Sequence, residues 1–147
     1  MIRFVLLTAG LLAIVFASAI TDEAFPQSVA VGQVWTIKSS SPTSAKVVIG
    51  RVETRSEAHI IHVSIIDIPD PSHRADDRRP LQIDHVPFSE AAIAGSVDQL
   101  VAIDTSPSPR FENGYDRWRQ DLNAGIFDIP VSEAISLFLQ AIIRKRT

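Results

Sequence analysis

Two neighbouring runs of β-branched residues constrain the fold of this chain more than any other feature. They span residues 46–54 and 58–68, and only three residues separate them. β-branched side chains favour the pleated surface of a strand, so the two runs predict a β-hairpin. In the second run, apolar side chains occupy both alternating sets of positions, which is typical of a strand covered on both faces. We therefore expect a central strand at residues 58–68, with helices packed on one side of it.

Two further segments extend the predicted sheet. Residues 32–38 alternate between apolar and polar side chains, as a half-buried strand does. Residues 81–88 form a short strand, and Pro87 is expected to end it because proline has no N–H to donate to the ladder. The sheet should therefore contain about four strands, all within residues 32–88.

The sequence pattern changes from strand to helix after these strands. Ser89 is suited to cap a helix, and apolar residues at helical spacing continue from Ile93 to Val101. This pattern predicts a helix from residue 89 to about residue 102.

Two more helices are expected in the remainder of the chain. One spans about residues 112–124, and the other follows Pro130 and ends with three basic residues, which its dipole favours. Runs of strands followed by runs of helices are typical of an α+β fold. The predicted domain is an antiparallel sheet of about four strands (residues 32–88) covered on one face by two or three helices (residues 89–146).

The first 19 residues have the pattern of a signal peptide. Arg3 precedes an apolar run over residues 4–16, and the small residues Ala17-Ser18-Ala19 follow it. The apolar run is shorter than the roughly 20 residues of a membrane-spanning helix. We expect cleavage after residue 19 and export to the periplasm or the extracellular medium; an anchor formed by residues 4–20 is the alternative. Residues 20–31 are then a lead-in to a single domain over residues 32–147.

Composition limits the chemistry and the partners of the exported part. The chain has no cysteine, so neither a disulfide nor thiol chemistry is available to it. Its formal net charge is −3, and loss of Arg3 with the leader makes it one unit more negative. A mildly acidic protein is not expected to bind nucleic acid or an anionic membrane surface. The expected partner is another protein or a small ligand.

Four short segments carry a resemblance to other proteins. They resemble a group of small exported bacterial proteins of unknown function, which implies a shared fold and assigns no functional residue. Where that group leads us to expect an aromatic side chain, this chain has Ile37. The segments are Gly32-Gln33-Val34-Trp35, His85-Val86-Pro87-Phe88-Ser89-Glu90, Ser96-Val97 with Leu100-Val101, and Gly114-Tyr115 with Trp118-Arg119.

All four histidines lie between positions 59 and 85, which raises the question of a metal site or a catalytic site. A small hydrolase or a metal-dependent enzyme would use His62, Asp84 and His85 from neighbouring strands. His59 and His62 are three residues apart, so they should point to opposite faces of a strand. Ser64 is available as a nucleophile, but the sequence lacks the Gly-x-Ser-x-Gly turn that exposes a catalytic serine. We therefore expect no metal and no cofactor, and an enzyme is only the alternative.

Two surfaces are better candidates, and both indicate binding rather than catalysis. Residues 69–80 form a long loop whose arginines Arg74, Arg78 and Arg79 could contact a partner. Tyr115 and Trp118 belong to an aromatic stripe on the predicted second helix, and aromatic side chains dominate binding energetics. The preferred interpretation is a non-enzymatic binding domain of the cell envelope.

Overall fold

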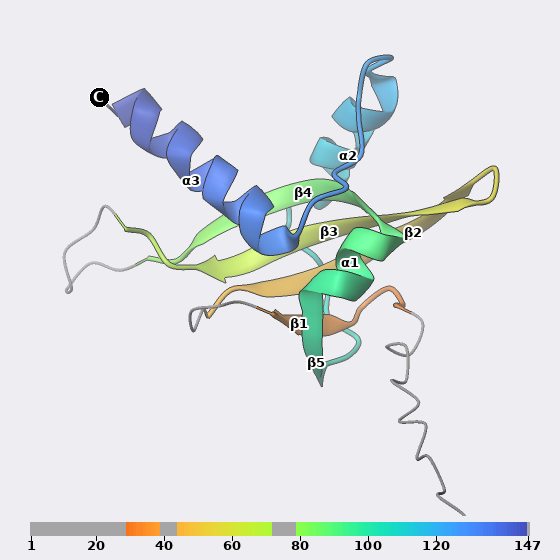
Figure 1. Cartoon of the computed structure of the whole chain (residues 1–147), viewed down its shortest axis with the longest axis horizontal. Helices are drawn as coiled ribbons and strands as arrows, with labels where there is room; N and C mark the ends of the chain where they lie inside the picture. Colours follow the sequence, from red (N-terminus) through yellow and green to blue (C-terminus); the bar gives the residue numbers. More distant parts are fainter. Residues whose placement is uncertain (1–28, 39–43, 72–78, 147) are drawn as a thin grey trace, which may run out of the picture.

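A computed structural model describes residues 29–38, 44–71 and 79–146. The predicted leader, Arg74 and Arg78 lie outside the described residues. The chain forms an α+β fold with a five-stranded antiparallel sheet in the order β4-β3-β2-β1-β5, which confirms the predicted class (Figure 1). The elements are β1 (Val34–Ile37), β2 (Lys46–Arg55), β3 (Ala58–Ile68), β4 (Leu81–Ser89), α1 (Glu90–Ser96), β5 (Val97–Ala102), α2 (Phe111–Gln120) and α3 (Val131–Arg146).

β3 is an interior strand of the sheet, as its two apolar faces predict. It pairs with β2 through the turn at Ser56, whose backbone is left-handed (φ 55°), and with β4 on its other side. On one face of β3, Ile61, Val63 and Ile65 are buried in the main hydrophobic cluster. On the other face, His62 and Ser64 are equally buried.

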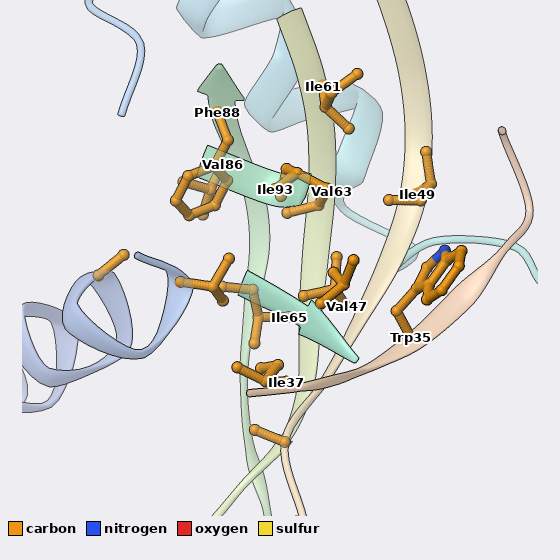
Figure 2. Close-up of a cluster of buried hydrophobic side chains, with 14 of the residues drawn as sticks. Trp35, Ile37, Val47, Ile49, Ile61, Val63, Ile65, Val86, Phe88 and Ile93 are labelled. Atoms are coloured by element: carbon orange, nitrogen blue, oxygen red, sulfur yellow. The ribbon is translucent and has the colours of Figure 1, made fainter. Parts of the chain in front are cut away.

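The main hydrophobic core lies between the sheet and helices α1 and α3. Figure 2 shows buried side chains from β1, β2, β3 and β4 in one cluster, to which Ile93 of α1 also belongs. Val131 and Ala134 of α3 join the same cluster. No described helix is long and apolar enough to cross a membrane.

Helix α2 covers the opposite face, so the expectation that the helices share one face holds only for α1 and α3. The aromatic side chains of α2 contact His62 of β3, whose neighbours Ile61 and Val63 point into the main core. Because successive side chains of a strand alternate between faces, α2 and the main core must lie on opposite sides of β3. α2 accordingly stands apart from α1 and α3 in Figure 1.

The predicted helix over residues 89–102 is wrong in its second half. Ser89 caps α1 as expected, accepting a hydrogen bond from the Ala92 N–H (3.1 Å). The helix ends at Ser96, and β5 then pairs with β1 and brings Leu100 opposite Trp35. Residues 97–102 pair with the free edge of β1, so their backbone groups find hydrogen-bond partners there. This non-local pairing outweighs the helical spacing of the side chains.

Two other element boundaries differ from the prediction. β4 continues through Pro87 to Ser89, because β4 is an edge strand and Pro87 needs no ladder bond on its open side. The Pro87 carbonyl is still used, because it accepts a hydrogen bond from the Phe127 N–H (2.9 Å). α2 ends at Gln120 rather than at residue 124, and Leu122, which lies inside the predicted helix, is fully exposed.

Candidate functional site

His62 and His85 form a buried pair on the α2 side of the sheet. His62 Nδ1 lies 2.9 Å from His85 Nε2, and the two rings stack with their centroids 5.2 Å apart. His62 has no exposed surface, and His85 is half-buried. The pair comes from adjacent strands, since His62 lies in the middle of β3 and His85 in β4.

His85 faces α2 because it is two residues from Pro87, which pairs with His62, and a bulge in β4 adds Asp84 to the same face. Val63 pairs with Val86 and Ile65 pairs with Ile83, so two steps along β3 correspond to three along β4. The extra residue lies at Asp84 or His85, and it cancels the alternation of side chains at this point. The side chains of Asp84 and His85 therefore both reach the α2 side, where strict alternation would place these two neighbours on opposite faces.

Glu53 of β2 completes a chain of hydrogen bonds. Its carboxylate oxygen lies 3.2 Å from His62 Nε2, and a carboxylate can only accept. His62 Nε2 therefore carries the proton, and its Nδ1 accepts the hydrogen bond from His85 Nε2–H. Tyr115 donates from its hydroxyl to the same Glu53 oxygen (3.3 Å). This network is complete when both imidazoles are neutral.

Burial favours the neutral histidines. It lowers the pKa of His62, although the Glu53 carboxylate acts in the opposite direction. Burial, with the neighbouring His62, lowers the pKa of His85 to about 4. Burial alone would raise the pKa of Glu53, but hydrogen bonds and charges from Arg55 and His62 lower it below its usual value. The expected state near pH 7 is a carboxylate beside two neutral rings.

Helix α2 covers the pair with three aromatic rings. Tyr115 and Trp118 meet His62 edge-on, at centroid distances of 5.0 and 4.7 Å, and Phe111 meets His85 at 5.3 Å. Edge-on contacts of this kind are the preferred geometry for aromatic pairs.

Two glycines allow α2 to approach the sheet this closely. A Cβ at Gly50 of β2 would lie 2.4 Å from the Phe111 ring, and one at Gly114 of α2 would lie 2.5 Å from His85 Cβ. Gly50 is also the extra residue of a bulge in β2, between Ile49 and Arg51.

Two arginines of β2 pack against the aromatic rings of α2 beside the histidine pair. The Arg51 guanidinium lies 4.2 Å from the Tyr115 ring centroid and that of Arg55 lies 4.6 Å from Trp118, both in cation–π geometry. Arg51 also pairs with Glu112 of α2 (3.1 Å), and Arg55 pairs with Glu53 (2.8 Å). The charged groups around the histidine pair are thus already paired, although the buried Arg51 Nε has no hydrogen-bond partner among the described residues.

The predicted metal or catalytic set is only partly assembled. His62 and His85 meet, but the Asp84 carboxylate accepts a hydrogen bond from the Ser108 hydroxyl instead. The Ser64 hydroxyl donates to the Asp84 carbonyl (2.7 Å) and accepts from the Ser108 N–H (2.9 Å). Among the described residues, no three His, Asp or Glu side chains are placed to hold a metal ion.

The predicted binding residues fall into two separate places. Arg79 is exposed beside a hollow at the base of the 69–80 loop, which Asp67, Asp70 and three prolines also line. Tyr115 is buried and Trp118 is half-buried, and both face the histidine pair rather than solvent. The Trp118 indole donates to the Gly125 carbonyl (2.9 Å).

Sequence reasoning missed three charged residues of the cluster. Arg51 and Glu53 occupy alternate positions of the first β-branched run and Arg55 continues the alternation just after it, so they share one face of the predicted hairpin. The structure places them on the His62 face because Arg51 pairs with His62; a turn one residue longer would have placed them on the other face.

A second surface lies at the β5 edge of the sheet. Leu100 and Val101 of β5 are exposed, and Ile103, which follows the strand, is 63% exposed. β5 pairs only with β1 among the described strands, so its outer edge has no strand beside it.

No family model, curated protein or solved structure matches the chain. The resemblance to small exported bacterial proteins therefore stays a prediction.

Proposed function

We propose that the protein is an exported, non-enzymatic interaction domain that binds a short extended segment of a partner protein along the outer edge of β5. The signal-peptide pattern of residues 1–19 supports the export, with the periplasm or the extracellular medium as its destination. The observation that carries the proposal is the exposed apolar strand at this edge of the sheet.

The two edges of the sheet differ in how they are protected. At the β4 edge, Phe127 exchanges two backbone hydrogen bonds with Pro87 and Ser89 (2.9 and 3.0 Å). At the β5 edge, no described segment plays that part. An uncovered edge presents free N–H and C=O groups, to which an extended peptide can add as a further strand.

The side chains of β5 suit an apolar partner with a basic flank. Edge strands are commonly protected by lysine or proline, and β5 has neither. Its exposed apolar residues lie between two acidic side chains, Asp98 and Asp104. Two register irregularities with β1 twist the strand, which limits the added segment to a few residues. The partner segment should therefore be short, extended and apolar, with lysine or arginine beside it.

We propose no catalytic role for His62, Asp84 and His85. The two histidines bond to each other, and Asp84 bonds to Ser108.

Site-specific photo-crosslinking tests the proposal. A benzophenone amino acid replaces Val101 in one variant and Leu137 of α3 in the control, since both side chains are 49% exposed. In cells that export the chain, position 101 should crosslink to one protein, within an apolar segment that has a basic flank. Identical products from positions 101 and 137 would contradict the proposal, and a crosslink to a second copy would replace it with self-association.

A synthetic peptide of the crosslinked segment then provides the affinity measurement. Leu100→Lys should weaken its binding to the purified protein about tenfold or more, because the variant removes an apolar contact and adds charge repulsion. Leu137→Lys serves as the matched control and should leave the affinity unchanged. Equal affinity of both variants would remove β5 from the binding site.

A further inference from the structure

We propose that the His62–His85 pair is an acid-sensitive latch, whose protonation releases α2 from the sheet and leaves the main core folded. This proposal is independent of the one for β5, because it concerns helix α2 and the opposite end of the sheet.

The geometry of the pair limits how many protons it can hold. Only 2.9 Å separates His62 Nδ1 from His85 Nε2, so one proton fits between these two nitrogens. A first added proton can go to His85 Nδ1 and preserve this bond. A second must go to His62 Nδ1, where two N–H groups would then face each other. The doubly protonated pair therefore cannot keep the closed arrangement.

Burial opposes the first proton, and the charged groups around the pair act in both directions. From β2, Glu53 favours a charged His62, but Arg51 and Arg55 disfavour it. From β4, Asp84 is turned to Ser108. From α2, Glu112 pairs with Arg51, and Arg119 adds a further cation 5.9 Å from the Tyr115 ring. Glu53 is thus the only carboxylate bonded directly to the pair among the described residues.

α2 can leave without dismantling the core. The main hydrophobic cluster is built from the strands, α1 and α3, and contains no residue of α2. Only Phe111 and Tyr115 of α2 are buried, and these side chains lie over the histidine pair and Gly50. The buried contacts of α2 are therefore the contacts that protonation disturbs, while the Arg51–Glu112 ion pair and the cation–π contacts of Arg51 and Arg55 also join α2 to β2.

The expected change follows from proton linkage. An accessible imidazole has a pKa near 6.5, whereas the pKa of His85 under α2 is about 4. The released form therefore binds the proton more tightly. From His85 alone, the ratio of released to closed α2 should rise by roughly 50- to 100-fold between pH 7.5 and pH 4.5.

Hydrogen exchange of the unmodified protein tests whether the release is local. At pH 4.5, after correction for the intrinsic exchange rate, residues 111–120 should lose protection while β3 keeps it. Loss of protection in α2 and β3 together would overturn the proposal, as would full protection of α2.

Trp118 fluorescence provides a second test, in which the histidines are changed. Trp35→Phe leaves Trp118 as the only tryptophan, and its emission should shift to the red as the pH falls from 7.5 to 4.5. His62→Gln with His85→Gln retains hydrogen-bonding groups without a titrating ring and should abolish the shift. His59→Gln is the matched control, since His59 is exposed and bonds only to Thr54 among the described contacts. A shift that persists in the double variant would overturn the proposal; if that variant is not folded at pH 7.5, the exchange experiment decides.

Discussion

At the scale of single residues, two glycines determine how closely α2 can approach the sheet. Gly50 and Gly114 lie on opposite sides of the contact, one in β2 and one in α2. A methyl group at either position would clash, because a Cβ at Gly50 would lie 2.4 Å from Phe111 and a Cβ at Gly114 would lie 2.5 Å from His85. The absence of a side chain is therefore what allows the aromatic rings to cover the histidine pair.

Gly114→Ala should destabilise the protein by about 1 to 3 kcal/mol, because overpacking outweighs the better helix propensity of alanine. Urea denaturation measures the change. Gly95→Ala is the matched control: Gly95 also lies in a helix, α1, but a Cβ there meets nothing within 4 Å. This control should be neutral or more stable by up to about 1 kcal/mol. Equal effects of the two substitutions would mean that the contact with His85 does not limit α2.

At the scale of elements, α2 and β5 both depart from what their own sequence pattern suggests. α2 has an aromatic stripe that would suit an exposed binding groove, yet the stripe packs on His62 and His85. β5 has helical spacing, yet it extends the sheet beside β1. In both elements, the available partner surface determines the outcome.

Phe111→Ala should release α2 preferentially. Phe111 is 1% exposed and fills the space over Gly50 and beside His85, so its truncation should cost about 3 to 5 kcal/mol of local stability. Amide exchange should increase in residues 111–120 and change little in β3. Leu122→Ala, at a fully exposed position just beyond α2, should leave exchange unchanged. Equal acceleration in α2 and β3 would show that α2 and the core unfold as one unit.

At the scale of the whole molecule, stability must come from packing, because the chain has no cysteine. The main core lies on one face of the sheet, and the polar and aromatic cluster lies on the other. In the latch proposal, the polar and aromatic cluster is the part of the molecule that responds to acid.

Thermal stability should fall as the pH falls from about 6.5 towards 4. The pKa of His62 and of His85 is lower in the folded protein than near 6.5 in the unfolded chain, so the unfolded chain binds more protons in this range. Their contribution to stability is complete above pH 6.5 and is lost through this window. Calorimetry at steps of half a pH unit measures the trend, and His62→Gln with His85→Gln should flatten it. An unchanged slope in that variant would assign the acid sensitivity to other groups.

The export proposal makes a prediction about the mature chain. Cleavage after residue 19 should give a protein that begins at Ile20, which intact-mass measurement of the exported protein can identify. A mass that still includes the leader would favour the anchor over residues 4–20.

The sequence by itself determined the elements that depend on local patterns. The β2–β3 hairpin, the interior position of β3, the cap at Ser89 and the α+β class all follow from alternation, β-branching and capping chemistry, which act over a few neighbouring residues. His62 and His85 were also singled out together, because both lie on neighbouring predicted strands.

Only the tertiary structure decided how those elements meet. The register of β4 on β3 pairs His62 with Pro87, and it thereby places His85 beside His62. β5 became a strand because β1 offered a free edge, and α2 covered the second face because its aromatic rings pack on His62 and His85 there. Each of these outcomes depends on contacts between residues far apart in the chain, which a local sequence pattern does not encode.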